Sequence, residues 1–283
     1  MEISYFNGNY LPHENIHISP DDRGFLFADG VYEVIRWYEG FFYDMEGHMA
    51  RLRRSLTGIR LTWDDADSFP SVAQELIKRN NLQTLPVLIY LQVTRGVARR
   101  SHAFPSPAVP PTVYAFARSF QPEKDLITKG IHTILREDNR WARCDIKSVS
   151  LLPNILSFQE AMESGAFECI FYRNDVITEC AHSNVFFMIN GILRTHPESE
   201  KILSGITRNN VLRLAHEAGV PVSETALPLN RLYGITEAFV TNTSFEIAPV
   251  VSINDKSVGK GVPGPVTRLL REKFDAGITA QRS

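Results

Sequence analysis

A chain of 283 residues suggests about two domains, or one large domain. Its 30 Lys and Arg residues against 32 Asp and Glu residues give a formal net charge of −2. This balance argues against a protein that coats nucleic acid or binds an anionic membrane surface, because both depend on a large basic excess. Hydrophobic residues make up 43% of the chain, which is ordinary for a globular protein and excludes wholesale disorder.

The cysteine and histidine patterns indicate neither a disulfide framework nor a metal site. There are three cysteines, an odd number without a Cys-x-x-Cys pair, and the histidines show no metal-ligand spacing. No signal segment opens the chain, and no apolar run approaches the roughly 18 residues that span a bilayer. We therefore expect a cytoplasmic protein without a metal, a membrane or a nucleic acid as partner.

Strand and helix patterns alternate along residues 1–118, which we expect to form a smaller N-terminal α+β domain. Residues 31–38 and 40–43 are predicted to pair as a hairpin. The next elements, in chain order, are a helix with the apolar stripe Met49, Leu52, Leu56 and Ile59, a helix at 67–80, and strands at 87–95 and 112–120. The proline-rich residues 104–111 are predicted to form a loop, because proline cannot donate to a sheet ladder.

Residues 119–122 are the expected linker, and residues 123–283 are expected to form a larger C-terminal α+β domain. Its predicted strands are residues 130–136, 144–149, 169–172, 184–189, 192–195 and 238–241. Its predicted helices are residues 153–164, residues 207–218 and a C-terminal helix from residue 266. Strands outnumber helices and both domains mix them, so the expected fold class is α+β.

Lys147 is the first candidate for chemistry. It lies in a strand-like segment between Ile146 and Val149, a relatively apolar neighbourhood. Desolvation lowers the pKa of an amine, which allows it to form a Schiff base with an aldehyde. The alternative is a lysine at a strand edge with its ammonium group in water.

Glu179 lies between two strand-like runs. A carboxylate at the end of a strand can hold a proton on a heterocycle nitrogen through a charge-assisted hydrogen bond. The alternative is an ordinary turn residue.

The segment Gly205-Ile-Thr-Arg208 combines a glycine with a threonine at the start of an amphipathic helix pattern. Exposed amides at a helix N-terminus, together with a threonine hydroxyl, form a phosphate-binding cup. Thr207 as a simple N-cap explains the residue type equally well.

Several cations are candidates for binding anions. Arg51 and Arg54 flank the apolar stripe of the first predicted helix, so either could reach inward or lie in solvent. Arg100 and His102 lie on the same side of an extended loop and could clamp a carboxylate. The alternative for this second pair is a solvated basic loop.

These pieces occur in an order and spacing that closely resemble the fold-type IV pyridoxal-phosphate aminotransferases, and among them most closely the D-amino acid (D-alanine) aminotransferases. The blocks that carry the resemblance are residues 22–34, 90–96, 143–152, 178–179, 183–186, 205–208 and 246–249. The resemblance implies a two-domain α+β fold whose C-terminal domain has a barrel-like mixed sheet with flanking helices. It also implies pyridoxal 5′-phosphate (PLP) in the cleft between the domains.

The resemblance assigns a role to each candidate. It implies that Lys147 is the catalytic Schiff-base lysine and that Glu179 is the partner of the pyridine nitrogen. The residues that match phosphate-binding positions are Arg51, Ile206, Thr207 and Thr243, and Leu203 matches a residue behind the ring. The residues that match a trap for the substrate carboxylate are Tyr32, Arg100 and His102, the last two expected from the neighbouring subunit of a homodimer with its active site at the interface.

The implied activity is a ping-pong transamination between D-amino acids, such as D-alanine and D-glutamate, and 2-oxo acids, such as 2-oxoglutarate and pyruvate. The alternatives on the same fold are a branched-chain L-amino acid aminotransferase and an aminodeoxychorismate lyase. A third alternative is a binding protein that keeps only the scaffold. His182 and Phe245 depart from the serines of similar proteins and leave the substrate range open.

Overall fold

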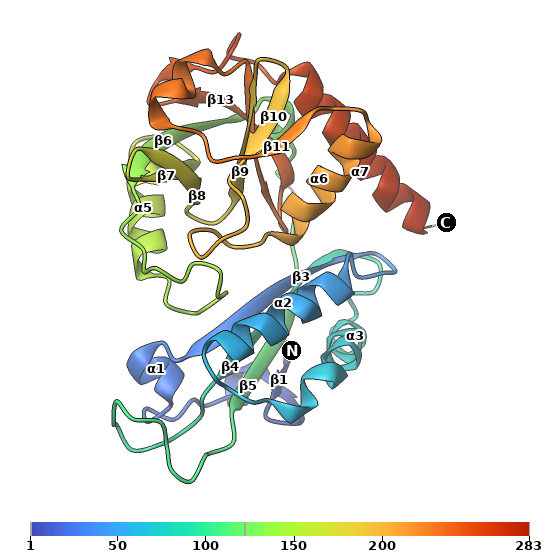
Figure 1. Ribbon diagram of the computed structural model, residues 1–283. Coiled ribbons are helices and arrows are strands. Elements are labelled where there is room, and N and C mark those ends of the chain that lie inside the picture. Colours follow the sequence, from blue (N-terminus) through green and yellow to red (C-terminus); the bar gives the residue numbers. More distant parts are fainter. Residues whose placement is uncertain (1, 122, 283) are drawn as a thin grey trace. The chain divides into compact units, whose positions relative to one another are not determined.

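The computed structural model describes residues 2–121 and 123–282, and their contacts form two compact units. Unit 1 contains residues up to 121 together with Ile146–Ser150, and unit 2 contains the described residues of 123–145 and 151–281. Pro122, part of the expected linker at 119–122, lies outside the described residues. Both units combine strands with helices, so the α+β fold class is confirmed (Figure 1).

Unit 1 is built on a five-stranded antiparallel sheet in the order β2-β1-β5-β4-β3. Its strands are β1 (Ile3–Phe6), β2 (Asn9–Pro12), β3 (Gly30–Tyr38), β4 (Pro86–Thr94) and β5 (Thr112–Ser119). Its helices are α1 (Arg23–Phe27), α2 (Met45–Gly58) and α3 (Phe69–Arg79), with 3-10 turns η1 (His13–Asn15) and η2 (Asp64–Ser68). The predicted helices and the two later strands are confirmed, whereas β1, β2 and α1 were not expected.

The predicted pairing of residues 40–43 with β3 is confirmed over a short stretch. The Tyr38 amide donates to the Phe41 carbonyl at 2.9 Å and the Tyr43 amide donates to the Arg36 carbonyl at 3.0 Å, around an antiparallel bridge between Trp37 and Phe42. The partner of β3 is β4, in an antiparallel register along the whole strand. The returning chain has no length for a second strand, because Asp44 already caps α2 by accepting a hydrogen bond from the Gly47 amide.

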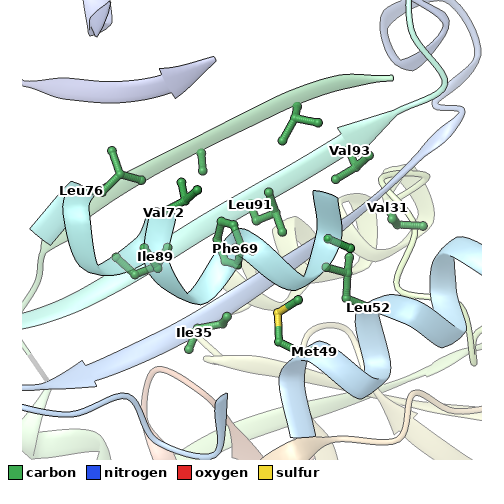
Figure 2. Packing of buried hydrophobic residues seen from close by; sticks show 14 of the residues in the cluster. Val31, Ile35, Met49, Leu52, Phe69, Val72, Leu76, Ile89, Leu91 and Val93 are labelled. Carbon is green, nitrogen blue, oxygen red and sulfur yellow. The ribbon is translucent and has the colours of Figure 1, made fainter. Parts of the chain in front are cut away.

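The core of unit 1 lies between its sheet and the helices α2 and α3 (Figure 2). Phe69, Val72 and Leu76 follow the spacing of one helix face and are buried on α3. Alternate residues of β4, among them Ile89 and Leu91, are buried on the facing side of the sheet. Both periodicities bring their apolar side chains to one interface, which holds α2 and α3 against the strands that carry site residues.

Unit 2 is built on a nine-stranded mixed sheet that curls into a half-barrel, in the order β11-β10-β9-β12-β13-β6-β7-β8 with β14 paired to β13. Its strands are β6 (Ile131–Glu137), β7 (Glu168–Arg173), β8 (Val176–Cys180), β9 (Asn184–Ile189), β10 (Ile192–Thr195), β11 (Val222–Glu224), β12 (Glu237–Asn242), β13 (Glu246–Ile253) and β14 (Lys256–Ser257). Its helices are α4 (Lys124–Thr128), α5 (Leu152–Glu163), α6 (Ile206–Glu217) and α7 (Pro265–Arg282), with the 3-10 turn η3 (Leu229–Gly234). The barrel-like character of this sheet is confirmed.

The predicted strand at 144–149 is wrong. Cys144 begins a turn, and the only pairing in the segment is an isolated bridge between Ser148 and Val31. Although this segment was expected in the second domain, Ile146–Ser150 packs with unit 1. The physical reason is Ile146, which is 6% exposed and belongs to the core of unit 1. The apolar pattern was therefore a sign of burial and not of a strand.

The core predicts a large stability difference between two leucines. We expect Leu76→Ala, at a fully buried position of α3, to lower the free energy of unfolding by about 2–5 kcal/mol through lost contacts and a cavity. Leu85→Ala is the matched control, because Leu85 is 41% exposed and its truncation should cost no more than about 0.5 kcal/mol. Urea denaturation followed by circular dichroism measures both, and equal losses would contradict this core.

Candidate active site

Lys147 is fixed by hydrogen bonds of its own main chain. Its amide donates to Ser55 Oγ of α2 at 3.1 Å, and its carbonyl accepts from the amide of Tyr32 on β3 at 3.0 Å. The Nζ atom lies 4.2 Å from the centroid of the Tyr32 ring, within the distance of a cation–π contact. Lys147 is half-buried, so its amine has a defined position over an aromatic face.

Arg51 is buried, which decides against the solvated position that its sequence left open. Its Nε and Nη2 atoms donate to the two carboxylate oxygens of Glu33 on β3, each at 2.8 Å. His48 Nδ1 lies 2.8 Å from Glu33 Oε2. Burial opposes ionisation of Glu33, yet the Arg51 charge and the hydrogen bonds hold the pKa of Glu33 well below its usual range. The bidentate pair orients the Arg51 guanidinium from β3.

Arg100 and His102 lie on the loop between β4 and β5, and both contact Phe27 of α1. The Arg100 guanidinium carbon is 5.1 Å from the Phe27 ring centroid, and the His102 and Phe27 rings are 5.6 Å apart. Arg23 Nη1 holds the loop by donating to the Ser101 carbonyl at 2.6 Å. The two side chains of the expected carboxylate trap are therefore neighbours on a loop with a fixed main chain.

Tyr32, the third residue of that expected trap, has different neighbours. Its ring stacks on Tyr90 with centroids 5.8 Å apart, and its other described ring contact is with Lys147. Unit 1 therefore groups Tyr32 with Lys147, and Arg100 with His102.

Glu179 is the buried acceptor of unit 2. It lies within β8, so the alternative of a turn residue is wrong. The Leu203 amide donates to both carboxylate oxygens at 3.1 Å, Asn184 Nδ2 donates to Oε2 at 2.9 Å, and Arg140 Nη1 donates to Oε1. Burial raises the pKa of Glu179, while the Arg140 charge and the hydrogen bonds from Arg140 and Leu203 oppose that rise.

Asn184, at the start of β9, joins Glu179 to the helix α6. Its Nδ2 atom donates to Glu179 Oε2 and to the Leu203 carbonyl, both at 2.9 Å. Gly205 precedes α6, and a Cβ added there would lie 2.0 Å from Asn184 Oδ1. This close approach requires glycine at position 205.

The N-terminus of α6 adjoins the turn after β12. Thr207 Oγ1 donates to the Asn242 carbonyl at 3.0 Å, and Asn242 Oδ1 accepts from the amides of the next turn. Thr243 is part of that turn. Gly205 occupies the N-cap position, so the interpretation of Thr207 as a simple N-cap is wrong. Ile206, Thr207 and Thr243 thus meet at a helix N-terminus, where amides and the helix dipole favour an anion.

Thr241 adds a buried hydroxyl to the same face. It pairs in register with Asn184 across β12 and β9, and paired residues point to the same side of a sheet. Its Oγ1 is the one buried hydroxyl without a hydrogen-bond partner within residues 2–121 and 123–282. A buried hydroxyl without a hydrogen-bond partner is typical of a site where a ligand supplies the partner.

His182 and Phe245 lie beside these residues and contact each other, with ring centroids 5.8 Å apart. His182 Nδ1 is 2.8 Å from Oε2 of the buried Glu168, and its ring meets Phe158 edge-on at 4.8 Å. His182 therefore has a fixed orientation next to the turn that carries Thr243.

Residues 30–253 match the family described as amino-transferase class IV. The chain belongs to this family. The D-alanine aminotransferase of Staphylococcus haemolyticus is 39% identical over 284 residues, which covers 100% of both chains. This similarity over the full length shows that both units of this class IV aminotransferase have counterparts in the relative.

Solved structures resemble this chain over nearly its full length. A branched-chain amino acid aminotransferase from Escherichia coli has a TM-score of 0.88 and 27% identity, covering 97% of this chain and 93% of that one. A second branched-chain amino acid aminotransferase, from T.th. and solved with pyridoxamine 5′-phosphate, has a TM-score of 0.89 and 25% identity, covering 98% and 94%. The family therefore includes structures that carry the amino form of PLP.

The contacts of several buried side chains of this aminotransferase could not be predicted from the neighbouring residues in the sequence. Glu33 lies 18 residues from its partner Arg51, and Arg140 lies 39 residues from Glu179, although its other carboxylate partner, Asp138, is two residues away. Asn184 lies five residues from Glu179 and 19 from Leu203. Within the described residues, no cluster of His, Cys, Asp or Glu could hold a metal ion. In the same part of the chain, no helix combines the length and apolar character required to cross a membrane.

The buried His48 predicts an acid-sensitive stability. Burial lowers the pKa of His48. Below about pH 6.5 the unfolded chain therefore binds a proton that the folded ring excludes, so the free energy of unfolding decreases as the pH is lowered. We expect His48→Gln to reduce this slope by up to about 1.4 kcal/mol per pH unit between about pH 7 and 5. Urea denaturation at several pH values measures it, with the exposed His17→Gln as control. An unchanged slope in His48→Gln would contradict a neutral buried ring.

Proposed function

We propose that this class IV aminotransferase transfers amino groups between D-amino acids, such as D-alanine and D-glutamate, and 2-oxo acids, such as 2-oxoglutarate and pyruvate. The observation that carries the proposal is the pairing within unit 2 of a buried carboxylate, Glu179, with the N-terminus of the helix α6. A protonated heterocycle and a phosphate on one small molecule fit such a pair. The 39% identity to a D-alanine aminotransferase over the full length supports the choice of D-substrates.

The side chains fit PLP, the cofactor of this family. Ile206, Thr207, Thr243 and Arg51 hold the phosphate in this proposal, and Leu203, whose amide is bound to Glu179, lies behind the ring. Glu179 keeps the proton on the pyridine nitrogen. Lys147 Nζ binds the aldehyde group of the cofactor in this proposal.

The bound cofactor supplies an electron-withdrawing ring that takes up negative charge from the substrate α carbon. Lys147 Nζ would hold the cofactor through its aldehyde until the amine of the substrate takes that place. The freed Lys147 amine would then be the base that moves the proton of the substrate α carbon. Hydrolysis by water would release a 2-oxo acid, and a second 2-oxo acid would take the amino group back through the reverse sequence, which is ping-pong transamination.

The choice of enantiomer follows from the position of the cations. Lys147 acts from one side of the α carbon, so the α hydrogen must point to that side. Exchanging the enantiomer then exchanges the places of the carboxylate and the side chain. We propose that Tyr32, Arg100 and His102 hold the carboxylate in the place that suits a D-amino acid.

A homodimer is part of the proposal. Three large apolar side chains of α5, Leu152, Ile155 and Leu156, are between 57% and 67% exposed in the single chain. Such an apolar surface suits burial against a second copy. In this arrangement Arg100 and His102 serve the active site of the neighbouring subunit. We also place the enzyme in the cytoplasm, where its three free cysteines stay reduced.

A half-reaction tests the proposed function. We expect D-alanine, added without a 2-oxo acid, to convert the yellow aldehyde form of the bound cofactor to its amino form, with L-leucine at least about 100-fold slower. Stopped-flow absorbance measures both rates, and Lys147→Ala serves as the inactive control. Conversion by L-leucine alone would overturn the D-specific proposal and favour a branched-chain L-aminotransferase, the activity named for the solved structures.

Subunit complementation tests the shared site. Arg100→Ala and Lys147→Ala should each be nearly inactive with D-alanine, yet their co-expression should restore roughly a quarter of the activity, since half of random dimers are hybrids with one intact site. Arg99→Ala on the same loop is the matched control and should keep its activity. No recovery in purified hybrid dimers would contradict an Arg100 that acts across the subunit interface.

A further inference from the structure

One arginine of unit 2 binds two carboxylates at once. Arg140 Nε and Nη2 donate to the two oxygens of Asp138, each at 2.9 Å, while Nη1 donates to Glu179 Oε1. The exposed fractions of the three side chains are 6% for Arg140, 6% for Glu179 and 0% for Asp138. Because water is nearly absent from this cluster, the guanidinium is the main source of positive charge for Glu179.

The position of Arg140 is fixed from several directions. Its Nη2 atom also donates to the Lys201 carbonyl at 3.3 Å, and its own amide donates to Asp138 Oδ1 at 3.1 Å. The guanidinium carbon lies 4.8 Å from the centroid of the Phe171 ring on β7. A planar guanidinium held in this way presents Nη1 to Glu179 in one orientation.

The charges of the cluster balance only when Glu179 is ionised. Arg173 Nη2 lies 3.2 Å from Asp138 Oδ1, so a second guanidinium compensates Asp138. Two buried thiols, Cys144 and Cys180, also lie near the cluster. Burial raises the pKa of Cys144 to about 11 and the pKa of Cys180 well above its usual value, so both stay neutral. Two carboxylates therefore face two guanidinium groups. Loss of Arg140 would leave one buried carboxylate without a cation.

We propose that Arg140 is a positioning residue that keeps the Glu179 carboxylate ionised and in one orientation, so that Glu179 can hold a proton on the ring nitrogen of the cofactor. A carboxylate buried without a cation takes up a proton itself. Neutral Glu179 would then leave the ring nitrogen unprotonated and the ring less able to take up charge. The link to the ring rests on the proposed function, whereas the effect of Arg140 on the ionisation of Glu179 does not.

The cofactor-free protein gives the first readout. Infrared difference spectroscopy follows the carbonyl band of the protonated Glu179 side chain during a pH titration, and Glu179→Gln identifies the band. We expect Arg140→Gln to raise the pKa of Glu179 by at least about one unit. Arg140→Lys keeps the charge and should raise that pKa less. If Arg140→Gln does not fold, the comparison of Arg140→Lys with the wild type carries the test.

Arg143→Gln is the matched control. Arg143 lies three residues from Arg140, is 40% exposed and pairs with Asp145. It should leave the Glu179 band unchanged. In the holoenzyme we expect Arg140→Gln to lower kcat for D-alanine at least about 10-fold with little change in KM, and Arg140→Lys to recover part of the loss.

An unchanged Glu179 titration in folded Arg140→Gln would overturn the inference, whatever the activity. An equal shift in Arg143→Gln would overturn it as well, because the effect would then be a general response to lost charge. A shifted titration with no transamination by the wild type would leave the inference on Glu179 in place and would reject the proposed function.

Discussion

A carboxylate enclosed by protein keeps its charge when a fixed cation or several hydrogen bonds compensate it, and each unit holds such a carboxylate against an arginine. Glu179 lies against Arg140, and Glu33 lies against Arg51. Removing the cation from such a pair costs about 3–5 kcal/mol, a large part of the stability of a domain. The same contacts that lower this cost also fix the side chains in place. Stability and the orientation of the proposed site therefore have one physical origin.

The two units contribute different chemistry. Unit 1 holds an amine, because the main chain of Lys147 is tied to Ser55 and Tyr32. Unit 2 holds a buried carboxylate, Glu179, and the N-terminus of α6, joined through Asn184. The proposed cofactor has an aldehyde, a basic ring nitrogen and a phosphate, which is one group for each of these features.

Local sequence predicted the parts of the fold that depend on periodicity. Phe69, Val72 and Leu76 follow one helix face, so α3 was expected within two residues of its ends. The segment around Lys147 was expected to be a strand. Its buried residue Ile146, which belongs to the core of unit 1, gives the same apolar pattern as a strand. Lys147, Glu179 and Thr207 were predicted as site residues from their local patterns and from the family resemblance. Arg140 was not, because its role comes from Asp138 and Glu179, and the second of these is 39 residues away.

The central claim is that an ionised Glu179 keeps the ring nitrogen of the cofactor protonated. Nitrogen-15 NMR of the holoenzyme, reconstituted with ring-labelled PLP, measures that protonation directly. The account predicts a protonated nitrogen in the wild type across the neutral pH range and an unprotonated nitrogen in Glu179→Gln. A nitrogen that is unprotonated in the wild type, or one that stays protonated in Glu179→Gln, would contradict it.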